Sequence, residues 1–98
     1  MGVLAERAAA AGVRLFHENE HRIFGDRPDR VLDVLKSVNS PALRGAYDAA
    51  NYVYCGYNPV EGWELTKAYT DHLHIKDWKG TGEQSHTGVL AGHGDGQI

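Results

Sequence analysis

The sequence feature that most constrains this chain is a regular alternation of helix-like and strand-like segments. The helix-like segments are rich in alanine or carry apolar residues three or four positions apart, which places them along one helix face. Short apolar runs of strand length follow them. Such alternation is typical of parallel strands joined by crossover helices, so we predict an α/β fold with a three-stranded parallel sheet and helices on one face. The predicted helices span residues 3–11, 28–38 and 59–69, and the predicted strands span residues 13–18, 42–47 and 72–76.

Residues with special backbone preferences mark the ends of these segments. Gly12 follows the first helix, where a left-handed residue commonly ends a helix. Pro28 and Pro59 stand in the first turn of the second and third helices, where proline removes no helical hydrogen bond. Asn58, just before Pro59, predicts a helix cap. The remaining stretches are predicted as loops: residues 19–27, residues 49–57 and a glycine-rich tail over residues 78–98.

Length and composition limit the chain to one domain and exclude several classes of partner. The chain has 98 residues, of which 42% are apolar and 23% charged, with a formal net charge of −3. This charge does not favour nucleic acid, and no apolar run approaches the roughly 18 residues that a membrane helix needs. The N-terminus lacks a secretory pattern, and the single cysteine, Cys55, cannot form an internal disulfide. We therefore expect a cytoplasmic protein with neither a nucleic-acid nor a membrane partner.

Each predicted strand ends on, or close to, a side chain that can bind a cation. Glu18, Asp48 and His74 occupy these positions, separated by 30 and 26 residues. Both separations are close to the length of one strand–helix unit, roughly 30 residues. Because parallel strands end at the same edge of a sheet, we expect the three side chains to meet there. Two carboxylates and one imidazole suit a divalent metal ion: Mn²⁺, Mg²⁺, Co²⁺ or Zn²⁺.

Taken singly, each of these residues also has a purely structural interpretation. Glu18 is consistent with a solvated loop residue, and Glu20 is equally available as a ligand. Asp48 is consistent with a cap on the loop that follows it. His74, like His72, is consistent with a core histidine that hydrogen-bonds to the backbone. The repeated position at strand ends is what favours a metal site.

The third predicted strand separates polar from apolar side chains. Leu73 and Ile75 alternate with His72, His74 and Lys76. Alternate residues of a strand face opposite sides of the sheet. We therefore expect a buried apolar side on this strand and a polar side that forms the floor of a site.

Two further polar residues are candidates for contacts to a ligand. Lys76 could hold a phosphate or an oxyanion, or it could pair with Asp77 or Glu20. Asn51 lies in the predicted loop after the second strand and could line a polar pocket. The glycine-rich stretch over residues 92–96 follows no predicted strand and opens no helix, so we do not interpret it as a dinucleotide-binding loop.

Four stretches of the sequence are specific in combination: LFHENE, YDAANYVYCGYNP, HLHIKDW and AGHGDG. Together they resemble the second half of the sugar phosphate isomerase/epimerase family, whose members have the xylose-isomerase-like (β/α)8 TIM barrel. The resemblance covers residues 13–98. It implies that residues 1–98 form a single partial TIM-barrel domain, a fragment whose strands would be the fifth to seventh, with the first four and the eighth absent.

The resemblance also implies a site and a reaction. Glu18, Asp48 and His74 would be three of four ligands of one divalent metal, and the family's fourth ligand, a glutamate on the eighth strand, is absent from this chain. The metal would bind a hydroxy-ketone and stabilise an enediolate, while Glu18 moves a proton at the neighbouring carbon. Asn51 and Lys76 would contact sugar oxygens. Asn51 replaces a histidine of some relatives, which counts against the apurinic-site endonuclease branch.

Three functions stay open on the sequence alone. The first is a metal-dependent isomerase or epimerase of a small sugar or sugar phosphate. The second is a related dehydratase or lyase acting on a cyclitol or keto acid, and the third is a non-catalytic fragment or half-barrel module. Three strands cannot close a barrel and leave two edges with unpaired backbone groups. We therefore expect the chain alone to be inactive, and to self-associate or be completed by another chain.

Overall fold

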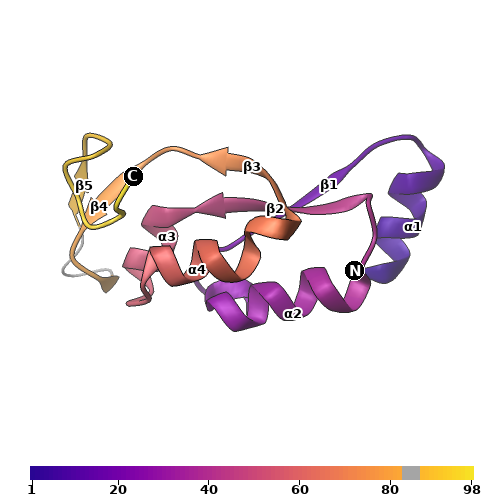
Figure 1. Cartoon of the computed structure of the whole chain (residues 1–98), viewed down its shortest axis with the longest axis horizontal. Coiled ribbons are helices and arrows are strands. Elements are labelled where there is room, and N and C mark those ends of the chain that lie inside the picture. The colour runs from indigo at the N-terminus through magenta and orange to yellow at the C-terminus, as the bar shows by residue number, and fades with distance from the viewer. Residues whose placement is uncertain (83–86) are drawn as a thin grey trace.

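Three parallel strands form one sheet, and helices cover one of its faces, as the sequence predicted (Figure 1). The computed structural model describes residues 1–82 and 87–98. Among these residues, no helix combines the length and apolarity needed to cross a lipid bilayer. The elements in chain order are α1 (Gly2–Ala10), β1 (Leu15–Glu18), the 3-10 turn η1 (Phe24–Asp26), α2 (Pro28–Val38), β2 (Leu43–Asp48), α3 (Ala49–Tyr54), α4 (Pro59–Thr66), the 3-10 turn η2 (Lys67–Tyr69), β3 (Thr70–His74), β4 (Asp77–Lys79) and β5 (Thr87–Val89).

The sheet has the strand order β1-β2-β3, and both pairings are parallel. The register pairs Glu18 with Ala46 and Asp48 with His74, with an irregularity between Gly45 and Ala46. All three strands run toward the end of the molecule that carries β4 and β5 (Figure 1). Their last residues therefore lie at one edge.

The core lies between the sheet and α2. Val31 and Leu35 of α2 pack with Leu43 of β2, and Ala5 and Tyr52 complete the cluster. All five side chains are buried. Burying one leucine fully contributes about 1.5–3 kcal/mol, so this cluster fixes α2 against the strands.

Two of the predicted loops contain a helix or strands, and the third contains only the short 3-10 turn η1. Residues 49–54 form α3, whose first turn is capped by the Asp48 side chain. The loop prediction was wrong here because packing buries the aromatic and apolar residues of this stretch, such as Tyr52, which is 1% exposed. In the predicted tail, β4 and β5 pair as an antiparallel hairpin. Residues 83–86 of that tail lie outside the described residues.

The third strand differs from its prediction in position and burial. β3 starts and ends two residues earlier than predicted. Leu73 and Ile75 are 48% and 66% exposed, so the expected apolar burial of this strand is wrong. The reason is topological: β3 is an edge of the described sheet, with β2 on one side only.

Gly62 of α4 lies directly against the ring of Tyr52. A Cβ atom at position 62 would lie 2.5 Å from Cε2 of Tyr52, a fully buried ring. We therefore expect Gly62→Ala to destabilise the fold by about 1–3 kcal/mol through overpacking, although alanine favours a helix by about 1 kcal/mol over glycine. Urea denaturation followed by circular dichroism measures the change. Gly2→Ala is the control, because its Cβ would meet no atom within 4 Å; equal losses in both variants would contradict the role of packing.

Candidate metal centre

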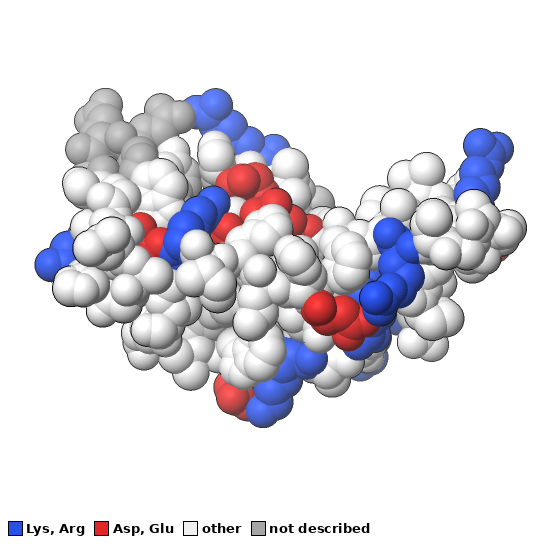
Figure 2. All heavy atoms as spheres, turned by 90° about the horizontal axis from the view of Figure 1, so that it is seen from above, with Lys and Arg blue, Asp and Glu red and all other residues white. Residues whose placement is uncertain are grey.

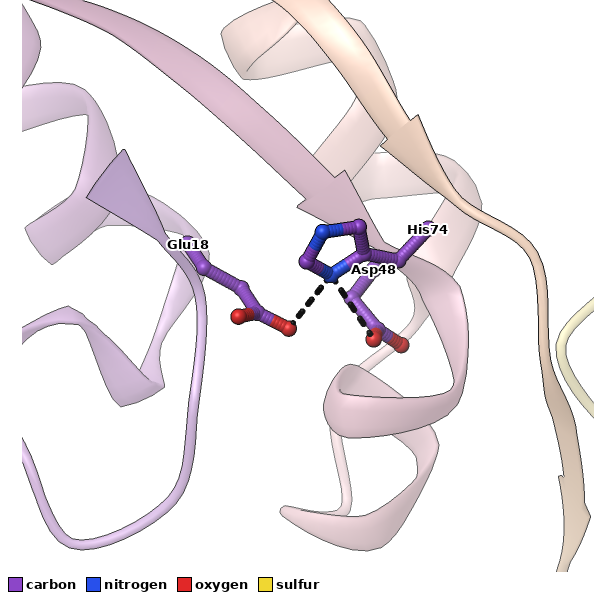
Figure 3. A group of neighbouring side chains, drawn as sticks. All are labelled: Glu18, Asp48 and His74. Atoms are coloured by element: carbon purple, nitrogen blue, oxygen red, sulfur yellow. Dashed lines mark hydrogen bonds and ion pairs between the residues drawn. The ribbon is translucent and has the colours of Figure 1, made fainter. Parts of the chain in front are cut away.

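Glu18, Asp48 and His74 converge at the C-terminal edge of the sheet. They are the last residues of β1, β2 and β3. Nδ1 of His74 lies 2.7 Å from Oε1 of Glu18 and 3.7 Å from Oδ2 of Asp48 (Figure 3). One possible ligand atom from each residue lies within 4.8 Å of the other two. The structure thus brings the three residues together, and their role as metal ligands stays a prediction.

The two carboxylate oxygens of Asp48 have different surroundings. The residue is 0% exposed. Its Oδ1 accepts a hydrogen bond from the backbone N–H of Asn51 at 3.0 Å. Its Oδ2 accepts no well-oriented hydrogen bond from any described residue, and the nearest cationic group is Nζ of Lys76 at 3.1 Å. A buried oxygen of this kind is a group that a bound cation would satisfy.

Electrostatics at Asp48 favour a cation in the same way. Burial raises the pKa of its carboxyl group, and the neighbouring negative charge of Glu18 acts in the same direction. The N–H of Asn51 and the ammonium group of Lys76 oppose this rise without cancelling it. A divalent cation beside Asp48 would shift the balance toward the ionised carboxylate.

The donor set fits a divalent metal ion. Two carboxylates and one imidazole are ligands that Mn²⁺, Mg²⁺, Co²⁺ and Zn²⁺ all accept. Three protein ligands leave further coordination positions for a substrate or another ligand. The side chains of Glu18 and His74 are partly exposed, at 33% and 39%. The remaining coordination positions of an ion bound here would therefore be open to solvent.

Asn19 belongs to this site although the sequence analysis did not single it out. Its side chain pairs with the backbone of Asp48 in both directions. Nδ2 donates to the Asp48 carbonyl and Oδ1 accepts from the Asp48 N–H, both at 2.8 Å. These two hydrogen bonds continue the contact between β1 and β2 past Glu18, the last residue of β1 that pairs with β2. The available signal was the position of Asn19 directly after a strand, where an amide side chain can replace a backbone partner.

The two predicted substrate-binding residues lie beside the candidate ligands. Asn51 is 5% exposed, and its Nδ2 donates to the Asn19 carbonyl at 2.8 Å and to Oε1 of Glu18 at 3.3 Å. The Asn51 amide therefore helps to orient the Glu18 carboxylate. Lys76 pairs with Asp48, not with either carboxylate considered from the sequence.

Asp77 is a second buried carboxylate, and it organises the glycine-rich segment over residues 92–96. Its Oδ1 accepts from the N–H groups of Trp78 and Gly96 at 3.0 and 2.9 Å. Its Oδ2 accepts from the N–H groups of Gly92 and Gly94 at 3.0 and 2.8 Å. A Cβ atom at position 94 or 96 would lie 2.5 or 2.7 Å from Oδ1, so both positions require glycine. Burial acts to raise the pKa of Asp77, but the four N–H groups outweigh it and lower the pKa.

The fold and the strand-end residues together define a segment of a (β/α)8 barrel, in which side chains at the C-terminal strand ends face the active site. Residues 1–98 match the profile of the xylose isomerase-like TIM barrel, and the chain belongs to this family. No curated protein matches the chain.

Two solved structures share this fold. One is a xylose isomerase domain protein from Planctomyces limnophilus, with 28% identity, a TM-score of 0.75, and coverage of 96% of this chain and 35% of that one. The other is the probable 3-DHS dehydratase AsbF of Bacillus anthracis, involved in petrobactin synthesis, with 20% identity, a TM-score of 0.72, and coverage of 80% and 28%. The chain therefore spans about a third of the length of these structures.

The role of Asn19 can be tested by truncation. We expect Asn19→Ala to lower the free energy of unfolding by about 2–4 kcal/mol, because it leaves the N–H and C=O of Asp48 buried without partners. Urea denaturation measures this loss. The exposed helix cap Asn58 is the control, since Asn58→Ala removes a cap worth about 1 kcal/mol. A loss from Asn19→Ala no larger than that of the control would contradict the role.

The lowered pKa of Asp77 predicts an acid-sensitive fold. Its pKa is lower in the folded state than in the unfolded state, where it is about 3.9. Ionised Asp77 therefore stabilises the fold above about pH 4, and this contribution is lost as the pH falls through the lowered pKa. We expect Asp77→Asn to be less stable at neutral pH and to lose less stability in acid. Urea denaturation between pH 2 and 7 tests this, with the exposed Asp33→Asn as control; an unchanged acid dependence in Asp77→Asn would contradict it.

Proposed function

We propose that this chain carries the metal-binding part of a divalent-metal-dependent isomerase or epimerase that acts on a small sugar or sugar phosphate. The proposal depends on one observation, the convergence of Glu18, Asp48 and His74 at one sheet edge. Family membership supports it, because TIM-barrel enzymes place their active sites at this edge. We also propose a cytoplasmic location, since the single cysteine, Cys55, is a free thiol.

The side chains take distinct roles in this proposal. A bound divalent ion would supply a Lewis acid that polarises a carbonyl oxygen of the substrate. Glu18 moves the proton between adjacent carbons, and Nδ2 of Asn51 orients its carboxylate through a hydrogen bond to Oε1. Lys76 balances the charge of Asp48 and donates to a substrate oxygen. Asn51 orients Glu18 and is a second candidate for contact with the substrate.

Two alternative functions rest on further observations. A dehydratase or lyase of a cyclitol or keto acid would use the same proton transfer, and the shared fold of the probable dehydratase from Bacillus anthracis motivates it. A non-catalytic half-barrel module is favoured by the exposure of Phe16, Leu73 and Ile75, at 43%, 48% and 66%. β1 and β3 are the two edges of the described sheet. We therefore also propose that further strands, from a second copy or another chain, pair with these edges.

Metal binding is the decisive test of this proposal. We expect Mn²⁺ to bind with measurable heat in titration calorimetry and to raise the free energy of unfolding. At a free ion concentration 100 times the dissociation constant, the increase is about 2.7 kcal/mol. Asp48→Ala removes the buried ligand and should abolish both effects. Glu18→Gln keeps the size of the side chain, removes its charge and should weaken binding strongly.

The control is Glu20→Ala, because Glu20 lies close to Glu18 in the sequence but pairs with His21. It should bind Mn²⁺ as the unmodified chain does. Binding heat and stabilisation that persist in Asp48→Ala would contradict the metal site. Their absence in the unmodified chain as well as in the variants would favour the non-catalytic module. With metal bound, products of unchanged mass identify an isomerase or epimerase, whereas loss of water identifies a dehydratase.

A further inference from the structure

A hollow lies between the β4–β5 hairpin and the segment that precedes Gly94, next to the candidate metal centre. It is broad and open to solvent, with a volume of about 720 Å³. We call it the hairpin pocket; the residues that line it include Lys76, Asp77, Trp78, Lys79, Val89 and His93. Lys76 belongs to both the metal centre and the hairpin pocket, because its Nζ lies 3.1 Å from Oδ2 of Asp48 and its side chain lines the hollow.

Among the described residues that line the hairpin pocket, the exposed charged side chains are cationic. Lys76 and Lys79 line it, and Lys79 has no ion-pair partner among residues 1–82 and 87–98. The acidic lining residue, Asp77, is 2% exposed, and four backbone N–H groups satisfy its carboxylate. The chain as a whole carries a formal charge of −3, and acidic and basic side chains lie next to one another on the face seen in Figure 2. The cationic side chains of this pocket therefore contrast with the net negative charge of the chain.

The backbone around the pocket is held in place by hydrogen bonds. Three of the four bonds to Asp77, from the N–H groups of Gly92, Gly94 and Gly96, fix the glycine-rich segment that contains His93. The His93 N–H also donates to the Leu90 carbonyl at 2.9 Å, and the Asp95 N–H donates to the Trp78 carbonyl at 2.8 Å. A pocket built this way needs little ordering of its backbone when a ligand arrives, which favours binding.

We propose that the hairpin pocket binds an anionic group of the substrate, a phosphate or a carboxylate, while the reacting carbons lie at the metal centre. This inference rests on the proposed function and narrows its substrate to an acidic one. Lys79 and Lys76 supply charge-assisted hydrogen bonds to the anion. The ring of Trp78, whose centroid lies 6.0 Å from Nζ of Lys76, forms the apolar wall beside the carbon chain. A neutral sugar offers no charge to Lys79, which has no ion-pair partner among the described residues, and binds more weakly.

Anion binding can be measured without any metal. The chain is treated with a chelator and titrated with inorganic phosphate or acetate, with glycerol as a neutral probe, and amide NMR signals of Lys79, Gly88 and His93 are followed. We expect saturable shifts with an anion and none with glycerol. Lys79→Met should weaken anion binding about tenfold or more. Lys67→Met is the matched control, because Lys67 lies on η2 and pairs with Glu64 at 2.7 Å, and it should bind as the unmodified chain does.

The outcomes separate this inference from the proposed function. Tighter binding of phosphate assigns a phosphoryl group to the substrate, and tighter binding of acetate assigns a carboxylate. Absence of saturable shifts with both anions, or equal losses in Lys79→Met and Lys67→Met, would overturn the proposal. No divalent ion is present in this titration, so a failure of the metal centre to bind Mn²⁺ leaves its result unchanged.

Discussion

The parallel pairing of β1, β2 and β3 is the constraint on which the candidate site depends. Successive side chains of a strand point to opposite faces, so a shift of one residue would turn a ligand toward the helices. The register sets Asp48 beside His74, and the side chain of Asn19 pairs with the Asp48 backbone from the neighbouring strand. The same pairing carries Glu18 to within 2.7 Å of His74. Strand register, not sequence proximity, assembles the cluster.

Asp48 and Asp77 show how surroundings give one residue type two uses. Both are buried, at 0% and 2% exposure. Asp48 keeps one oxygen without a well-oriented hydrogen bond from the described residues, and burial raises its pKa. The four backbone N–H groups around Asp77 instead outweigh the effect of burial and lower its pKa. Asp48 is therefore suited to hold a cation, whereas Asp77 fixes the glycine-rich segment that forms one wall of the hairpin pocket.

Sequence reasoning succeeded where local periodicity decides the structure. The range of α2 matches its prediction, because a proline start and an apolar stripe define it. Reasoning failed for α3, whose six residues have too little length for a helical period and are held by burial of Tyr52 and its neighbours. It missed Asn19, because the position of this residue directly after a strand does not indicate a reciprocal pair with a backbone 29 residues away. The sequence also predicted that Leu73 is buried, but it is 48% exposed. Its burial depends on whether a further element packs against β3.

The sequence by itself determined the alternation of helices and strands, and with it the meeting of Glu18, Asp48 and His74 at one edge. Both follow from chain direction and residue periodicity, which are local properties. Only the tertiary structure decided which carboxylate stays short of hydrogen bonds and which is saturated, because desolvation and hydrogen bonding depend on segments that lie far apart in the chain. The pocket beside Lys79 was decided in the same way, by the packing of the glycine-rich segment around Asp77.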